Sequence, residues 1–95
     1  MKEKILTILM NELGYSVHEA EVTAEDLMNL QPTLQPIFQK WFDNREITEV
    51  LVSGFSLKKL MEKQGYTFPS ALIAMDWLLT EPEVAKKALS EYAKK

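Results

Sequence analysis

The hydrophobic positions of this chain recur at the three- and four-residue spacing of amphipathic helices. Residues 2–13 show this spacing first, and Gly14 follows them as a helix stop. Residues 33–42 show it most strongly, because their apolar residues form one wide stripe: Leu34, Ile37, Phe38, Trp41 and Phe42. We therefore predict a helix over each segment. The stripe loses its phase at Asp43, which with Glu46 has the spacing of a capping box.

Residues 15–30 allow two helix starts. Ser16 with Glu19 and Thr23 with Asp26 both have the spacing of a capping box. Either one helix starts at Ser16, or a loop crosses to a helix that starts at Thr23. We favour Thr23, because the acids that follow it would then lie in a first turn, where the helix dipole favours negative charge.

Residues 46–53 fit either a helix or a strand. Their β-branched content allows a strand. The spacing of Ile47, Val50 and Leu51 favours a helix, and we find no convincing partner strand elsewhere in the chain. We therefore expect a short helix here, ended by Gly54.

Ser56 gives the clearest local signal. It is a good N-cap, and Phe55 and Leu60 occupy the two positions of a hydrophobic staple around it. The pattern predicts a helix over 57–64 that stops at Gly65.

Residues 69–79 are apolar almost all round, so we expect the buried central helix there, with Leu72 and Trp77 among the most buried residues. Thr80 with Glu83 has the form of a capping box for a last helix that ends near residue 92. This helix should turn five residues inward: Val84, Ala85, Ala88, Leu89 and Tyr92. The fold class is therefore all-α, a single-domain orthogonal bundle of five to six short helices over residues 1–95.

Composition excludes several classes of protein. The hydrophobic content of 46% is too high, and the net charge of −3 too small, for a disordered chain. A chain of 95 residues makes one domain of ordinary size. So short a chain has little room for a core and a deep pocket, so we expect no enzyme and no cofactor. Without cysteine there is no disulfide and no thiolate zinc site. The apolar runs are too short for a signal peptide or a membrane span, which indicates a cytoplasmic protein without a membrane partner.

Charge is unevenly distributed along the chain. No Lys or Arg occurs between Ile5 and Gln39. Residues 1–39 carry −4 and residues 40–95 carry +1. An acidic first part argues against a nucleic-acid surface there, and it suits a basic partner or solubility alone.

Three predicted helices have the lengths and the short connecting turns of a tri-helical DNA-binding domain. They cover residues 46–53, 57–64 and 69–79. A recognition helix must present polar and basic side chains to the groove, whereas residues 69–79 contain no Arg or Lys. A helix-turn-helix-like DNA-binding regulator is therefore the alternative function rather than the first.

Two polar residues are candidates for acid–base or metal chemistry. His18 is the only histidine, and no His pair or zinc-binding helix motif accompanies it, so we expect it to be solvated. Asp76 lies in an apolar helix and must find water or a partner there. We expect it either to lie on the one solvated edge of this helix or to accept a hydrogen bond from a helix cap or from Trp41. We assign no catalytic, cofactor or metal residue.

The predicted function is a small protein–protein interaction or regulatory module, with self-association left open. Its aromatic part is Phe55, Tyr66 and Phe68, which flank two consecutive turns and could gather into an exposed patch. Its acidic part, which should face a basic protein partner, has four residues: Glu19, Glu21, Glu25 and Asp26. The alternative is that the aromatics only close helix ends and the acids only keep the chain soluble.

Overall fold

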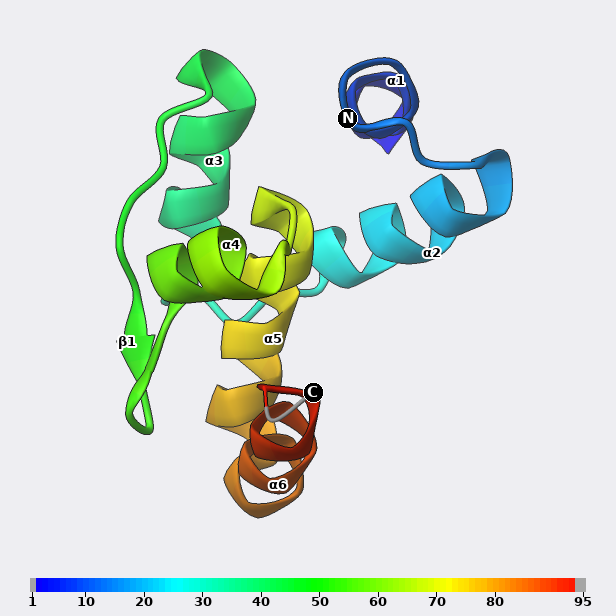
Figure 1. Ribbon diagram of the computed structural model, residues 1–95. Coiled ribbons are helices and arrows are strands. Elements are labelled where there is room, and N and C mark those ends of the chain that lie inside the picture. Colours follow the sequence, from blue (N-terminus) through cyan, green and yellow to red (C-terminus); the bar gives the residue numbers. More distant parts are fainter. Residues whose placement is uncertain (1, 94–95) are drawn as a thin grey trace.

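The computed structural model describes residues 2–93, and within them the chain forms six helices and one short β-hairpin (Figure 1). In chain order these are α1 (Lys2–Leu13), α2 (Val17–Met28), α3 (Gln35–Asn44), β1 (Leu51–Val52), β2 (Phe55–Ser56), α4 (Leu57–Gln64), α5 (Phe68–Thr80) and α6 (Pro82–Ala93). The predicted all-α class is confirmed.

Helix α5 runs through the middle of the molecule, and most of the other helices pack on it (Figure 1). Helices α2 and α4 contact α5, α6 packs on it as well, and α1 packs on α2. The buried apolar residues form one core cluster, to which α5 contributes residues from several faces: Phe68, Ala71, Leu72, Ala74, Met75 and Leu78. The prediction of a buried central helix is confirmed.

Helix α2 begins directly after Ser16, so the favoured start at Thr23 is wrong. The Oγ of Ser16 accepts the backbone N–H of Glu19 at 3.2 Å, and the Oε1 of Glu19 accepts the backbone N–H of Ser16 at 3.0 Å. The earlier start also buries Ala20 against the core. Two reciprocal hydrogen bonds and a longer buried face outweigh the small dipole benefit of acids in a first turn.

Helix α3 continues to Asn44, where Arg45 takes the left-handed conformation with φ 58°. Asp43 therefore lies inside the helix, and the expected capping box with Glu46 does not form. The apolar stripe is correctly predicted, since Phe38 and Trp41 are buried on one face of α3.

The expected helix over 46–53 is wrong. Residues 45–50 have no regular secondary structure, and β1 pairs antiparallel with β2. Ser53 and Gly54 connect the strands with φ of 51° and 84°, both positive as a type I′ turn requires. Only Ser53 and Gly54 separate β1 from its partner strand β2, so Gly54 is a turn residue and not a helix stop.

The boundary between α5 and α6 differs in detail from the prediction. Thr80 is the last residue of α5, and its hydroxyl donates to the carbonyl of Trp77, while the Glu81 carbonyl accepts the first α6 hydrogen bond from Ala85. The expected capping box at Thr80 is therefore wrong. Val84 is exposed rather than inward-facing, and the side chain of Tyr92 lies outside the part of the chain that the structure describes.

Trp77 is not among the most buried residues. Its ring is half-buried, and its Nε1 donates to Glu81 Oε1 at 3.2 Å near the surface. An indole has one polar end, and here that end reaches the solvent side of α5. Leu72 is fully buried, as predicted.

Candidate functional site

All four predicted acidic residues are exposed on α2, but two of them have structural partners. Glu19 belongs to the capping box, whose hydrogen bonds from Ser16 lower the pKa of its carboxyl. Glu25 Oε1 lies 2.8 Å from the ammonium of Lys2, and this contact raises the pKa of Lys2. The Asp26 carboxylate has no hydrogen bond or ion pair among residues 2–93. Glu21 likewise has no hydrogen bond or ion pair among residues 2–93, but its charge acts on Lys2. Asp26 is therefore the acid of α2 that is most available to a partner.

Val22 lies in the middle of this acidic surface and is 51% exposed. Residues three and four positions away are its neighbours on the helix surface. They are His18, Glu19, Glu25 and Asp26. We call these five residues, Val22 included, the acidic face of α2. It combines an exposed aliphatic group with three carboxylates, one imidazole and no Lys or Arg.

A cavity of about 320 Å³ adjoins the acidic face, lined by Tyr15, His18, Glu19, Val22, Thr23 and Ser70. At Ser70 it reaches three hydroxyl groups that bond one another. The Tyr15 hydroxyl lies 2.6 Å from Thr67 Oγ1 and 3.0 Å from Ser70 Oγ, and the Thr67 hydroxyl donates to Ser70 Oγ at 3.0 Å. Thr67 is also the N-cap of α5. The cluster therefore ties the start of α2 to the start of α5 and gives the cavity a rigid polar side.

The three predicted aromatic residues do not form one patch. Tyr66 lines a second cavity of about 380 Å³ with Thr67 and Ser70, so Ser70 borders both this cavity and the one beside Glu19. Phe55 lies on the hairpin, on the opposite side of the molecule from α2 (Figure 1). Phe68 is only 2% exposed and lies in the core. The structure thus brings together the acidic face and Tyr66, and leaves out the other two aromatics.

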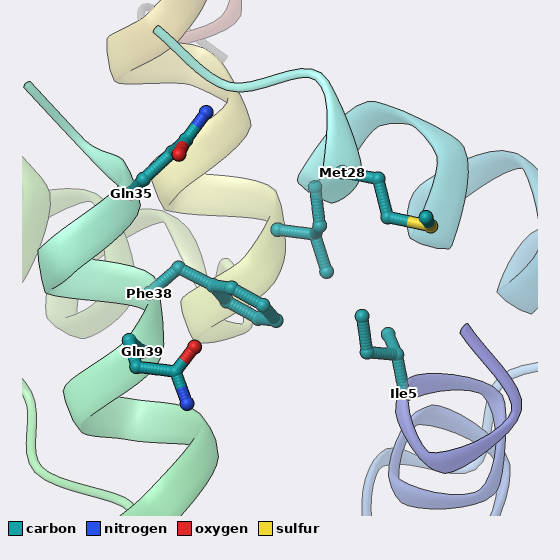
Figure 2. A pocket seen from close by; sticks show the side chains of 6 residues that line it. Ile5, Met28, Gln35, Phe38 and Gln39 are labelled. Carbon is teal, nitrogen blue, oxygen red and sulfur yellow. The ribbon is translucent and has the colours of Figure 1, made fainter. Parts of the chain in front are cut away.

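A second surface feature, which the sequence analysis missed, lies between α1, the end of α2, and α3. It is a cavity of about 200 Å³ (Figure 2) lined by Ile5, Leu27, Met28, Gln35, Phe38 and Gln39. Ile5, Leu27 and Phe38 are buried core residues, whereas Met28 is 47% exposed at the rim. The missed signal was the pair Gln35 and Gln39, two polar residues one turn apart beside the apolar stripe of α3.

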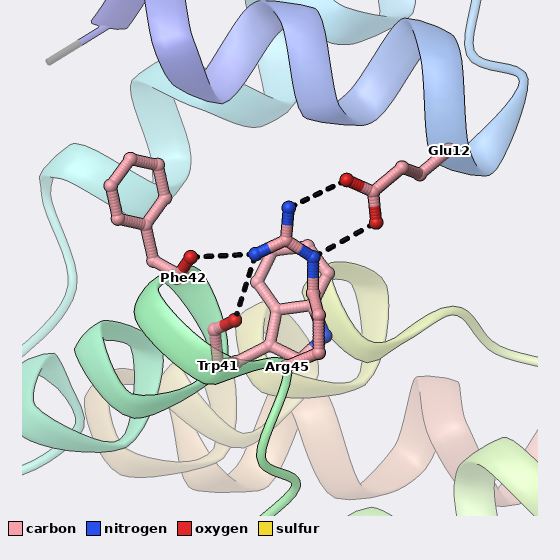
Figure 3. A network of polar contacts seen from close by, with 4 residues as sticks. All are labelled: Glu12, Trp41, Phe42 and Arg45. Carbon is pink, nitrogen blue, oxygen red and sulfur yellow. Dashed lines mark hydrogen bonds and ion pairs between the residues drawn. The ribbon is translucent and has the colours of Figure 1, made fainter.

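Arg45 joins the ends of α1 and α3 (Figure 3). Its Nε and Nη2 donate to the two carboxylate oxygens of Glu12 at 2.8 and 2.6 Å, and its Nη1 donates to the carbonyls of Phe42 at 2.6 Å and Trp41 at 3.2 Å. The guanidinium carbon lies 5.1 Å from the centroid of the Trp41 ring. The hydrogen bonds between Arg45 and Glu12 lower the pKa of Glu12 and raise the pKa of Arg45. The carboxylate accepts from two of the five N–H donors of the guanidinium, and the two carbonyls accept from two more.

The candidates for acid–base or metal chemistry have ordinary surroundings. Asp76 Oδ1 accepts the backbone N–H of Gln31 at 2.8 Å, so it caps a turn and does not bond Trp41. His18 is exposed at the rim of the cavity beside α2. Among residues 2–93 no group of three or more His, Cys, Asp or Glu side chains could hold a metal ion. In the same part of the chain, no helix is both long and apolar enough to span a membrane.

The helix-turn-helix arrangement loses its first element, because residues 46–53 contain a strand and not a helix. Its expected recognition helix, α5, is buried in the core and presents no Lys or Arg.

Comparison of the chain with protein-family models, curated proteins and solved structures finds no match in any of the three.

Proposed function

We propose that this protein is an interaction module whose acidic face of α2 binds a basic segment of a partner protein. The observation that carries the proposal is Val22, a half-exposed aliphatic residue framed by three carboxylates and next to an open cavity. An isolated exposed apolar residue needs no explanation. An apolar residue inside a charged frame offers both parts of a recognition site, because charge steers the partner and apolar contact holds it.

Lysine or arginine side chains of the partner suit this face. Such side chains can lay their aliphatic stems on apolar surface while the charged head reaches a carboxylate. On α2 the stem would lie on Val22 and the head would reach Asp26, whose carboxylate has no partner among the described residues. The segment between positions 5 and 39 contains no Lys or Arg that would repel a basic partner, and the charge of Lys2, which lies beside this face, is paired with Glu25.

The test is a titration of the protein with an amphipathic lysine–leucine peptide, followed by the backbone amide resonances in NMR. We expect saturable shifts concentrated at Glu19–Asp26, and binding that weakens as salt rises, because exposed charges are screened over about 10 Å at 0.1 M. The same peptide with glutamate in place of lysine should cause no shifts.

Asp26→Lys is the informative variant, because it should abolish most binding without weakening the fold. Asp26 lies in the last turn of α2, where the helix dipole disfavours an acid, and lysine there should raise stability by about 0.3–1 kcal/mol. The matched control is Glu62→Lys, a charge reversal at an exposed position of α4. Equal affinity of both variants for the peptide would refute the proposal, and so would preferential binding of duplex DNA.

The structure also changes which acids should be mutated. Glu19→Lys would break the capping box, and Glu25→Lys would remove the partner of Lys2. Loss of binding in those variants would mix a change of charge with a change of fold.

A further inference from the structure

The cavity between α1, α2 and α3 has an apolar floor and one polar wall. Ile5 from α1, Leu27 and Met28 from α2, and Phe38 from α3 meet in it (Figure 2). Within residues 2–93, no charged residue lines it. The polar wall consists of the side-chain amides of Gln35 and Gln39, one helical turn apart on α3. Met28, Gln35 and Gln39 are exposed, so the cavity opens to solvent along this rim.

Hydrogen bonds set the orientation of both amides. Gln35 Nε2 donates to the carbonyl of Leu30, and Gln39 Nε2 donates to Asp43 Oδ1, each at 2.9 Å. A carbonyl and a carboxylate are acceptors only, so each amide must present its nitrogen to them. Figure 2 accordingly shows each amide oxygen on the side of the Phe38 ring and each nitrogen on the far side. Neither oxygen accepts a hydrogen bond from residues 2–93, so the wall offers two acceptors.

The volume indicates what the cavity can hold. An apolar cavity of about 150 Å³ holds benzene, and sites for drug-sized molecules begin at about 300 Å³. At about 200 Å³ this cavity suits one ring system slightly larger than benzene. We expect an uncharged occupant, because the lining has no carboxylate to pair with a cation and no Lys or Arg to pair with an anion, so either ion would lose hydration without compensation.

We propose that the cavity binds the indole ring of a tryptophan side chain on a partner polypeptide. The indole N–H donates to the Oε1 of Gln39, and a backbone N–H of the same polypeptide donates to the Oε1 of Gln35. Phenylalanine has no donor, and tyrosine carries its hydroxyl at the tip of the ring, which would point into the apolar floor. The exposed thioether of Met28 can lie at the ring edge, where sulfur–aromatic contact is favourable.

This inference goes beyond the acidic face of α2 and does not depend on it. The two surfaces share helix α2 but none of their lining residues. If no basic peptide binds the acidic face, the proposed indole site is unaffected. If no indole binds the cavity, the proposal for the acidic face is unaffected.

The first test uses the unmodified protein with N-acetyltryptophanamide, whose resonance shifts in NMR report the site. We expect saturable shifts at the lining residues, including the side-chain amide of Gln39. The analogue methylated at the indole nitrogen should bind about tenfold more weakly, since it has lost the donor and gained a methyl group at the polar wall. N-acetylphenylalaninamide should be weaker by a similar factor. No saturation at millimolar concentration, or equal affinity for all three compounds, would overturn the proposal.

The second test separates a polypeptide from a free indole as the source of the ring. Free indole has no backbone N–H for Gln35, so it should bind several-fold more weakly than N-acetyltryptophanamide. Indole that bound as tightly would overturn the assignment to a partner polypeptide.

The third test locates the acceptor. Gln39→Met removes the oxygen and should reduce the discrimination between the indole and its N-methyl analogue to less than about twofold. Gln39→Glu combined with Asp43→Asn keeps an acceptor at position 39 and a hydrogen bond between the two side chains, and should preserve the discrimination. Gln39 is exposed and bonds only Asp43 through its side chain, so both variants should fold. Unchanged discrimination in Gln39→Met would overturn the assigned hydrogen bond.

Discussion

The indole of Trp41 stacks on the ring of Phe68, with the ring centroids 5.1 Å apart and the planes 17° from parallel. Both rings are buried, and the contact joins α3 to the first turn of α5. The stack explains why Phe68 cannot belong to a surface patch. Its ring is the partner of a core tryptophan, and Thr67, just before it, caps the helix that places it there.

Phe68→Ala should therefore destabilise the protein by about 3–5 kcal/mol, since it removes a buried aromatic ring and leaves a cavity. Trp77→Ala should cost less, because the Trp77 ring is half-buried and its polar end already lies near the surface. Urea unfolding followed by circular dichroism measures both losses. If Phe68→Ala does not fold, Phe68→Leu gives a milder version of the comparison. A larger loss for Trp77→Ala than for Phe68→Ala would contradict this ranking.

Glu49 closes the N-terminus of α4 together with the N-cap Ser56. The Ser56 hydroxyl donates to Glu49 Oε2 at 2.5 Å, and Glu49 Oε1 accepts the backbone N–H groups of Lys58 at 3.1 Å and Val50 at 2.9 Å. These hydrogen bonds, that from Ser56 first, lower the pKa of the Glu49 carboxyl below its ordinary value of 4.5. The carboxylate therefore favours the folded state when it is ionised.

Because the folded pKa of Glu49 lies below the unfolded one, its contribution is present above pH 4.5 and is lost as the pH falls through the folded pKa. Glu49→Gln should thus lower stability at neutral pH and make the acid loss of stability shallower. Thermal melts from pH 7 to about pH 3 test this. Ser56→Ala should cost about 1 kcal/mol at neutral pH, the usual worth of an N-cap. A Glu49→Gln protein with the same pH profile as the parent would count against the cap.

Substitutions at the two residues of the hairpin turn should have opposite effects on stability. Gly54 has φ 84°, so Gly54→Ala should destabilise the protein by about 1 kcal/mol. Ser53 also has a positive φ, of 51°, which asparagine tolerates better than serine. Ser53→Asn creates the Asn-Gly pair preferred in type I′ turns and should raise the melting temperature. A drop in melting temperature on this change would mean that the turn has another geometry.

The ion pair between Glu12 and Arg45 links α1 to α3 and is exposed to solvent. Its contribution to stability should therefore depend on the salt concentration. Glu12→Gln should lower the melting temperature at low ionic strength. The difference in melting temperature between variant and parent should shrink at about 1 M salt, where charges are screened over about 3 Å. Glu62→Gln, at an exposed position of α4, is the control and should change little. An Arg45→Lys variant should behave like Glu12→Gln, since lysine cannot form the bidentate contact. A loss that is the same at both salt concentrations would show that the tie is not electrostatic.

Periodicity was enough to predict most of the helices. The apolar spacing over 2–13 and 57–64, with Gly14 and Gly65 after them, matches α1 and α4, and the unbroken apolar run over 69–79 matches α5. These signals are local, because a helix satisfies its backbone hydrogen bonds within four residues and shows its buried face as a repeat. Caps are local too, which is why Ser56 was recognised correctly.

Where two local signals competed, only packing could decide between them. Ser16 and Thr23 both looked like caps, and burial of the earlier turn of α2, Ala20 included, favoured Ser16. Residues 46–53 had helical spacing and β-branched content, and the pairing of Leu51 with Ser56 favoured the strand. Propensity differs by only a few tenths of a kcal/mol between such alternatives, so a few tertiary contacts can override it.

For the candidate sites too, some features are visible in the sequence and others arise only from the tertiary structure. The acids of α2 and the absence of basic residues before position 40 are properties of the sequence and could be seen in it directly. The tertiary structure decided that Phe68 stacks on Trp41 in the core, that Lys2 pairs with Glu25 and not with Asp26, and that Gln35 and Gln39 border a cavity. The reason is physical: composition and periodicity describe each helix alone, whereas exposure and cavities arise from how separate helices meet.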